Sequence, residues 1–289
     1  MNQTNFQISK EPILMHFAHA NSFPAGSYRA VFDEFRKLNS VSENKQNVQI
    51  FALDKFAHDS QFPINDNWHN PVDELIHHIT KHVEKTSASK QKVIAIGHSF
   101  GAVISYIACC KRPELFAGLI MLDPPLITGF ARFIFRFAKG NRLIDKITPA
   151  KQTQMRKRKW HKHDDLVAYF SERTLFKNME KRCIEDYISS VTEHRGEHRL
   201  LSFDPDIEAS IFRTIPHNLP DYYGKLECPA KIITGGFTDV CIPRLRNPFL
   251  KANPEVEHQA LHTGGHMFPL EHPKQTAHAI HQTLVSWAR

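Results

Sequence analysis

Short apolar segments alternate with amphipathic stretches along most of this chain. Six short segments are expected as β-strands: Ile13–His19, Val48–Leu53, Val93–Ile96, Leu119–Leu122, Ala230–Thr234 and Val256–Leu261. The stretches between them carry apolar residues at three- and four-residue spacing, which predicts helices over residues 28–38, 72–84, 100–110, 243–251 and 273–287. This alternation predicts the α/β class, with a mostly parallel central sheet flanked by helices on both faces.

The alternation stops at Asp123-Pro124-Pro125 and resumes at Ala230. Between these points the pattern is helical and charged, without convincing strands. We therefore expect an α/β core formed by residues 1–125 and 222–289, and a helical cap inserted at residues 126–221.

The charge is concentrated in this insertion. From residue 126 to residue 221, 18 Lys and Arg residues and 13 Asp and Glu residues contribute +5 to the chain's net charge of +7. The densest basic run, Arg156–His163, is followed at once by Asp164-Asp165. We interpret it as a solvated helix face and expect no nucleic-acid partner.

Composition points to a cytoplasmic globular protein. No apolar stretch approaches the roughly 20 residues of a membrane span, and the polar start of the chain does not resemble a signal peptide. The five cysteines have no regular spacing, so no disulfide framework is expected. No dinucleotide or phosphate-binding motif and no convincing metal-ligand pattern is present, so neither a cofactor nor a metal is predicted.

The motif Gly97-His98-Ser99-Phe100-Gly101 directly follows the apolar run Val93–Ile96 and precedes a predicted helix. A buried strand that ends at Gly-x-Ser-x-Gly and continues as a helix presents the serine at the apex of a strained turn. We therefore expect Ser99 to be a nucleophile above the carboxyl edge of the sheet.

A serine nucleophile needs an imidazole base, and the base needs a carboxylate. His266 follows two glycines in the loop after the last expected strand, which predicts the base. Two aspartates end neighbouring strands and compete for the third role. Asp239 is favoured because Ser99, Asp239 and His266 follow one another in the order Ser, Asp, His, and Asp123 is kept as the alternative acid.

An oxyanion needs two hydrogen-bond donors. We expect them to be the backbone N–H of Phe100, which follows the nucleophile, and the backbone N–H of Asn21, in the loop after the first strand. His98 is expected either to line the substrate pocket or to pack within the turn.

The insertion opens with the amphipathic segment 130–139. Phe130, Phe133 and Phe137 share one face, and cationic side chains occupy the other. We expect the aromatic face to cover a pocket for an apolar substrate. A helix lying at a membrane interface is the less favoured alternative.

Taken together, these motifs resemble the α/β-hydrolase fold family over nearly everything outside residues 126–221. The resemblance implies a nucleophile at Ser99, an acid at Asp239, a base at His266 and a helical cap from about Leu126. It departs from the family pattern in two places. His19-Ala20 replaces the usual His-Gly pair, and only about ten residues precede the first strand, so two early strands are missing or reduced to residues 5–9.

The expected activity is hydrolysis of a carboxylic ester of an apolar small molecule through an acyl-enzyme. A carbon–carbon bond hydrolase, a thioesterase and a perhydrolase remain alternatives on the same triad. A lipase acting at a lipid surface and a non-catalytic binding module of the same fold are further alternatives. The oligomeric state is left open.

Overall fold

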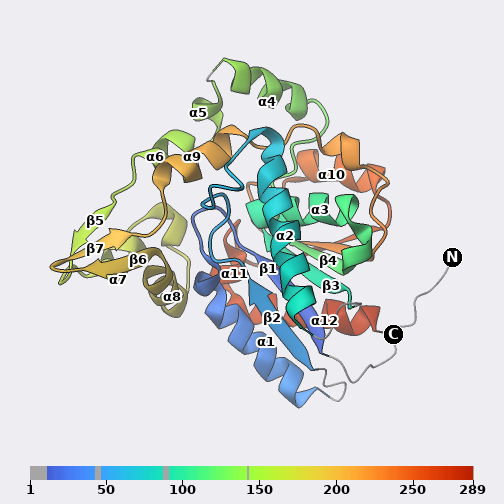
Figure 1. The fold of residues 1–289 in the computed structure, drawn as a ribbon, viewed down its shortest axis with the longest axis horizontal. Coiled ribbons are helices and arrows are strands. Elements are labelled where there is room, and N and C mark those ends of the chain that lie inside the picture. Colours follow the sequence, from blue (N-terminus) through green and yellow to red (C-terminus); the bar gives the residue numbers. More distant parts are fainter. Residues whose placement is uncertain (1–11, 43–46, 87–90, 142, 289) are drawn as a thin grey trace.

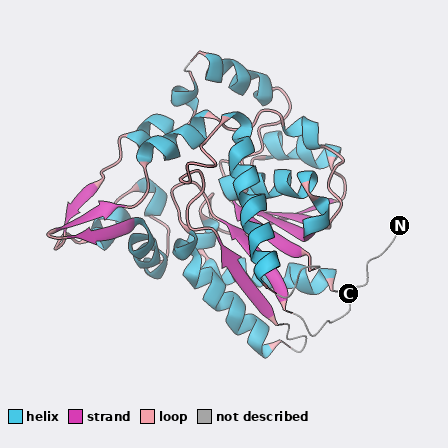
Figure 2. Ribbon diagram, in the orientation of Figure 1, coloured by secondary structure: helices cyan, strands magenta, loops and turns pink. Residues whose placement is uncertain are grey.

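A six-stranded parallel sheet forms the centre of the molecule (Figures 1 and 2). The computed structural model describes residues 12–42, 47–86, 91–141 and 143–288. The strand order is β2-β1-β3-β4-β8-β9, and every pair of neighbours is parallel. The six expected strands are confirmed as β1 Ile13–Ala18, β2 Val48–Ala52, β3 Val93–His98, β4 Phe116–Leu122, β8 Ala230–Thr234 and β9 Val256–Ala260.

Helices cover both faces of this sheet. On one face lie α1 Arg29–Val41 and α12 Pro273–Trp287. On the other lie α2 His69–Lys85, α3 Phe100–Lys111 and α10 Pro243–Ala252. Alternate side chains of each strand enter the two cores: Leu14 of β1 joins the α2/α3 side and Met15 the α1/α12 side. This arrangement confirms the predicted α/β class.

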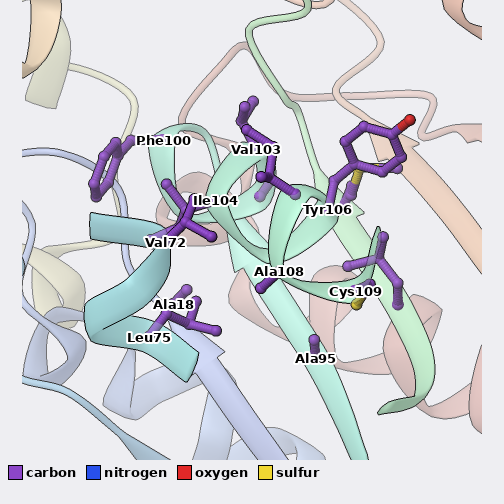
Figure 3. Close-up of a cluster of buried hydrophobic side chains, with 14 of the residues drawn as sticks. Ala18, Val72, Leu75, Ala95, Phe100, Val103, Ile104, Tyr106, Ala108 and Cys109 are labelled. Carbon is purple, nitrogen blue, oxygen red and sulfur yellow. The ribbon is translucent and has the colours of Figure 1, made fainter. Parts of the chain in front are cut away.

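Helix α3 is the most deeply buried of these helices. Every residue from Phe100 to Cys110 is buried, and Figure 3 shows its apolar side chains packed toward Val72 and Leu75 of α2 and toward the sheet. A helix that is apolar all round can only be stable in a core. The nucleophile turn is therefore attached to a helix that is held on all sides by the core.

The insertion contains more than helices, which corrects the expectation of a purely helical cap. Strands β5 Lys159–His161, β7 His198–Leu201 and β6 Thr192–Arg195 form an antiparallel sheet in that order. The basic run that we interpreted as a helix face thus includes β5. These strands are short and their polar side chains are mostly exposed, so no apolar run marks them in the sequence.

The remaining elements are short. The insertion's helices are α4 Ala131–Gly140, α5 Ile144–Ile147, α6 Ala150–Gln154, α7 Leu166–Ser171, α8 Lys181–Val191 and α9 Pro205–Arg213, and α11 Phe268–Glu271 precedes α12. Single 3₁₀ turns are η1 Ala25–Tyr28, η2 Asp66–Trp68, η3 Pro113–Leu115, η4 Thr174–Phe176 and η5 Leu219–Tyr222.

Residues 5–9, the predicted remnant of the early strands, lie outside the described residues. The boundaries of the cap stay a prediction.

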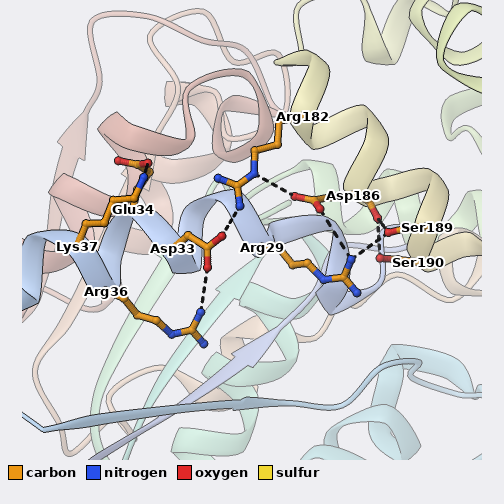
Figure 4. A network of polar contacts seen from close by, with 9 residues as sticks. All are labelled: Arg29, Asp33, Glu34, Arg36, Lys37, Arg182, Asp186, Ser189 and Ser190. Carbon is orange, nitrogen blue, oxygen red and sulfur yellow. Dashed lines mark hydrogen bonds and ion pairs between the residues drawn. The ribbon is translucent and has the colours of Figure 1, made fainter.

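A polar network joins α8 of the insertion to α1 of the core (Figure 4). Arg182 of α8 pairs with Asp33 of α1, and Arg29 of α1 binds Ser189 (3.0 Å) and lies 3.8 Å from Asp186, both on α8. The side chains of Arg29, Arg182 and Asp33 are exposed, so each pair adds little stability by itself. Together they fix the place where the insertion meets the core.

Candidate active site

Ser99 occupies a strained turn between β3 and α3. Its φ of 53° and ψ of −118° lie in a region that non-glycine residues rarely adopt. The two outer glycines make this turn possible. A Cβ atom at Gly97 would lie 2.3 Å from the carbonyl oxygen of Gly101, and one at Gly101 would lie 2.0 Å from that of Ala18. The turn therefore packs directly against the end of β1, where the predicted oxyanion loop begins.

His266 bridges the serine and a carboxylate. Its Nε2 lies 3.0 Å from Ser99 Oγ, and its Nδ1 lies 2.7 Å from Asp123 Oδ2. An ionised carboxylate can only accept, so Nδ1 carries the proton and Nε2 is left to accept the serine hydroxyl proton. The Asp123 side chain is fully buried, while that of His266 is 19% exposed. The buried Asp123 thus orients the imidazole through Nδ1, while part of the His266 side chain stays accessible to solvent.

The structure places Asp123, the alternative acid, against the imidazole, and it does not place the favoured Asp239 there. Asp239 is exposed beyond the end of β8 and makes no contact with His266 among the interactions of the described residues. The order Ser, Asp, His did not separate the candidates, because Asp123 also lies between Ser99 and His266. The difference arises from the sheet, where β4 lies next to β3 and its end stands beside the nucleophile turn.

The loop after β8 contributes Thr238 instead. Its hydroxyl donates to Asp123 Oδ2 over 2.5 Å and accepts the N–H groups of Val240 (3.1 Å) and Cys241 (3.3 Å). Asp123 is further held by its backbone N–H, which donates to the Ile233 carbonyl over 2.9 Å, at a φ of 46°. Thr238 had no motif to reveal it in the sequence.

The two predicted oxyanion donors lie at the expected places in the fold. Phe100 is the first residue of α3, so no preceding helical turn offers its N–H a carbonyl. Asn21 is buried in the loop after β1, and its side-chain amide donates to the Glu208 carbonyl over 2.9 Å. Their role as donors to an oxyanion stays a prediction.

Residues of the insertion brace this loop, which sequence analysis missed. Glu208 of α9 is fully buried and accepts hydrogen bonds from the Ser22 hydroxyl and, at 3.0–3.1 Å, from Arg156. Burial raises the pKa of the Glu208 carboxyl, while Arg156 acts in the opposite direction. Arg156 also donates to the Tyr187 hydroxyl, and the ring of Tyr187 packs on Phe23. These contacts of the insertion thus hold the loop that carries Asn21 in place.

His98 is an internal link rather than a lining residue. It is fully buried; its Nδ1 accepts the Tyr28 hydroxyl at 2.7 Å and its Nε2 donates to the His266 carbonyl at 2.9 Å. The Tyr28 oxygen also accepts the backbone N–H of Ala20 over 3.3 Å. Burial, followed by the nearby His266, holds the pKa of His98 well below its usual value, so it stays neutral. A continuous chain therefore connects the oxyanion loop to the backbone of the base.

The three aromatic residues expected to wall the pocket face solvent instead. The side chains of Phe130, Phe133 and Phe137 are all exposed on α4. The face of α4 that packs on the core carries Ala131, Phe135 and Ala138. The amphipathic pattern predicts the helix correctly, but its aromatic face lies on the solvent side because the face with Ala131 and Ala138 occupies the contact with the core.

Among the described residues, no group of three or more His, Cys, Asp and Glu side chains is arranged to hold a metal ion. No helix in the described part of the chain combines the length and apolarity needed to cross a membrane.

Comparison with known proteins agrees with this fold. A profile of the Alpha/beta hydrolase family matches residues 17–279. A monoglyceride lipase homologue of Monkeypox virus is 26% identical over 107 residues, which are 36% of this chain and 36% of that protein. Ethanol acetyltransferase 1 of Kluyveromyces lactis is 30% identical over 116 residues, 40% of this chain and 27% of that protein. The alignments thus span about a third of these relatives' lengths.

Among solved structures, the peroxisomal alpha-beta-hydrolase Lpx1 from Saccharomyces cerevisiae superposes with a TM-score of 0.73 at 15% identity, covering 96% of this chain and 79% of that one. E-2-(acetamidomethylene)succinate hydrolase superposes with a TM-score of 0.72 at 15% identity, covering 95% and 91%. At this identity the likeness concerns the fold alone. The family match spans nearly the whole chain, and the protein therefore belongs to the alpha/beta hydrolase family.

Proposed function

We propose that this hydrolase cleaves a carboxylic ester through an acyl-enzyme on Ser99. The observation that carries the proposal is the position of His266, whose two ring nitrogens contact Ser99 Oγ and Asp123 Oδ2 at 3.0 and 2.7 Å. A neutral serine hydroxyl is a weak nucleophile until such an imidazole removes its proton.

The reaction follows from this arrangement. Ser99 Oγ attacks the ester carbon while its proton passes to His266 Nε2, and the buried Asp123 carboxylate stabilises the imidazolium. The backbone N–H groups of Asn21 and Phe100 receive the negative charge on the former carbonyl oxygen. The bond to the alcohol then breaks, and the alcohol leaves with the proton from His266.

A water molecule completes the cycle. It gives a proton to His266 Nε2 and attacks the acyl carbon, and the carboxylic acid leaves as Ser99 recovers its proton. We place the cap at residues 126–221, and its Arg156–Glu208 pair keeps the oxyanion loop in place during both halves of the reaction.

An ester is the favoured substrate because one sequence relative is named a monoglyceride lipase homologue, and a monoglyceride is an ester. Serine at position 99 argues against the reactions that require an aspartate nucleophile, such as epoxide hydrolysis. Short p-nitrophenyl esters, an acyl-CoA and a vinylogous diketone, assayed side by side, will separate the esterase from a thioesterase and from a carbon–carbon bond hydrolase.

The decisive experiment is active-site labelling with a fluorophosphonate probe. The native chain is expected to be labelled on residue 99, Ser99→Ala is expected to abolish labelling, and Ser40→Ala on α1 is the matched control that keeps it. Failure of the folded native protein to react would overturn the proposal and favour a non-catalytic binding module of the same fold.

A further inference from the structure

Helix α4 presents an uncovered aromatic stripe. The side chains of Phe130, Phe133, Ile134 and Phe137 are 70%, 52%, 46% and 64% exposed. Because residues three and four apart share a helix face, these side chains form one continuous stripe. Ile147 of α5 and Met155, just beyond α6, are also exposed. Contiguous apolar surface of this kind usually marks an interaction site.

The rest of α4 holds this stripe outward. Ala131, Phe135 and Ala138 on another face pack against the buried core. Lys139 near the end of the helix donates to Asp66 (2.6 Å) and contacts His217 Nδ1 at 3.0 Å. Turning the aromatic side chains inward would break all of these contacts. The stripe is therefore a surface of the folded protein, and Figure 1 shows α4 and α5 at the outer edge of the molecule.

The same edge carries a positive net charge. Among its described residues, 130–141 and 143–147, four are Lys or Arg and one, Asp145, is an acid. That acid is itself paired with Arg213 at 2.7 Å. On α4, Arg136 is exposed, and the Arg132 guanidinium lies 4.7 Å from the centre of the Phe133 ring. Long cationic side chains beside an apolar stripe allow the stripe to enter an apolar phase while the charges stay with anionic groups.

We propose that the α4–α5 edge (residues 130–141 and 143–147) docks on the surface of an anionic phospholipid bilayer. The aromatic stripe enters the boundary between headgroups and acyl chains, and the surrounding Arg and Lys side chains meet lipid phosphates. A second copy of this chain is a poorer occupant, because a symmetric contact would bring together two edges on which Arg136 and Lys146 are exposed. The acids at this edge, Asp145 and Asp66, already pair with Arg213 and Lys139. The inference does not depend on the reaction at Ser99.

The full chain carrying Ser99→Ala can test this by co-sedimentation with vesicles. We expect it to bind vesicles of phosphatidylcholine mixed with phosphatidylglycerol, and to bind those of phosphatidylcholine alone much more weakly. The double variant Phe133→Ser/Phe137→Ser should bind the anionic vesicles at least about tenfold more weakly. Arg132→Gln/Arg136→Gln should weaken binding and reduce its dependence on salt.

Two matched controls lie on α1. Val41→Ser removes an apolar side chain that is 82% exposed, and Arg36→Gln/Lys37→Gln removes two exposed cations. Both controls should bind vesicles as the parent does. The proposal is overturned if anionic vesicles are not bound, or if the phenylalanine variant binds them as well as the parent. A dimer in sedimentation equilibrium that this variant abolishes, without vesicle binding, would instead identify a second copy as the occupant.

Discussion

Helices α2 and α4 both carry apolar side chains at three- and four-residue spacing, yet the two patterns end in opposite environments. Leu75 and Ile79 of α2 are fully buried against the sheet, whereas Phe133 and Phe137 of α4 are more than half exposed. Periodicity identifies which face of a helix is apolar. Whether that face is covered depends on the elements packed around the helix. In the insertion, those elements contact the face of α4 that carries Ala131, Phe135 and Ala138.

Ionisable groups differ between the two regions in the same way. In the core, His16, His19 and His98 are buried and burial lowers the pKa of each, that of His19 to about 4. In the insertion, His161 and His163 are exposed. The core thus uses polar groups as fixed internal connections, and the insertion presents most of its own to solvent. The buried Arg156–Glu208 pair is a marked exception, and it lies where the insertion touches the oxyanion loop.

The largest effect is expected at the two aspartates of the core. Asp123→Asn should lower kcat/KM about 10⁴-fold, because an amide cannot hold the imidazole in the required tautomer. Asp239→Asn, which changes an exposed side chain, should leave kcat/KM within about threefold. Steady-state kinetics on a p-nitrophenyl ester measures both. A larger loss at Asp239 than at Asp123 would mean that the acid acts from β8.

The second effect tests the contact between the insertion and the core. Arg156→Met should lower the free energy of unfolding by about 3 kcal/mol, because it leaves the buried Glu208 carboxylate without its partner. Arg158 lies two residues after Arg156 and forms an exposed ion pair with Asp206. Arg158→Met should therefore cause no measurable change in the free energy of unfolding. Urea unfolding compares the two variants. Equal losses would show that burial of the Arg156 pair is not what matters.

The third effect is a pH dependence of stability that belongs to the core. Burial, and then the charges of His78, His19 and His82, lower the pKa of His16. As the pH falls, His16 is therefore protonated in the unfolded chain at a higher pH than in the folded protein. The contribution of His16 to the free energy of unfolding should be fully present above about pH 6.5. Below that pH it should decrease by at most about 1.4 kcal/mol per pH unit. His16→Gln should reduce the slope by about one proton. His163→Gln, at an exposed position, is the control, and an equal reduction of the slope in that variant would contradict the contrast.

The fourth effect concerns Tyr28, a positioning residue that does not touch substrate. Tyr28→Phe removes the hydroxyl between Ala20 N–H and His98 and should lower kcat about tenfold with KM within about twofold. Tyr106→Phe is the matched control, because its hydroxyl bonds to Tyr222 O at 3.1 Å, on another side of the core. An equal loss of kcat in both variants would indicate a general packing defect instead of a link to the base.

The smallest effect is expected on α4. Phe133→Ser/Phe137→Ser should change the free energy of unfolding by less than about 0.5 kcal/mol. Leu75→Ala on α2 should cost about 3 kcal/mol, because it leaves a cavity in a closed core. Thermal or urea unfolding distinguishes them. A loss on α4 comparable to that on α2 would mean that the aromatic stripe is covered in solution.

The local sequence determined the fold class and most of the site. Buried parallel strands are largely apolar runs, which identified the central strands, whereas the partly buried edge strands β2 and β9 were recognised from their place in the alternation. The Gly-x-Ser-x-Gly turn fixes its own geometry because side chains at Gly97 and Gly101 would collide with backbone. His266 could be located because it follows the last strand. Each of these features depends on residues close together in the chain.

Only the tertiary structure decided the rest. The choice of Asp123 over Asp239 depends on β4 lying beside β3, and the support from Thr238, Tyr28 and Glu208 depends on contacts between residues far apart in the chain. The polar strands of the insertion and the outward face of α4 likewise follow from which surfaces their neighbours leave free. A pattern in one segment specifies which of its side chains are apolar, whereas their partners are set by the packing of the whole chain.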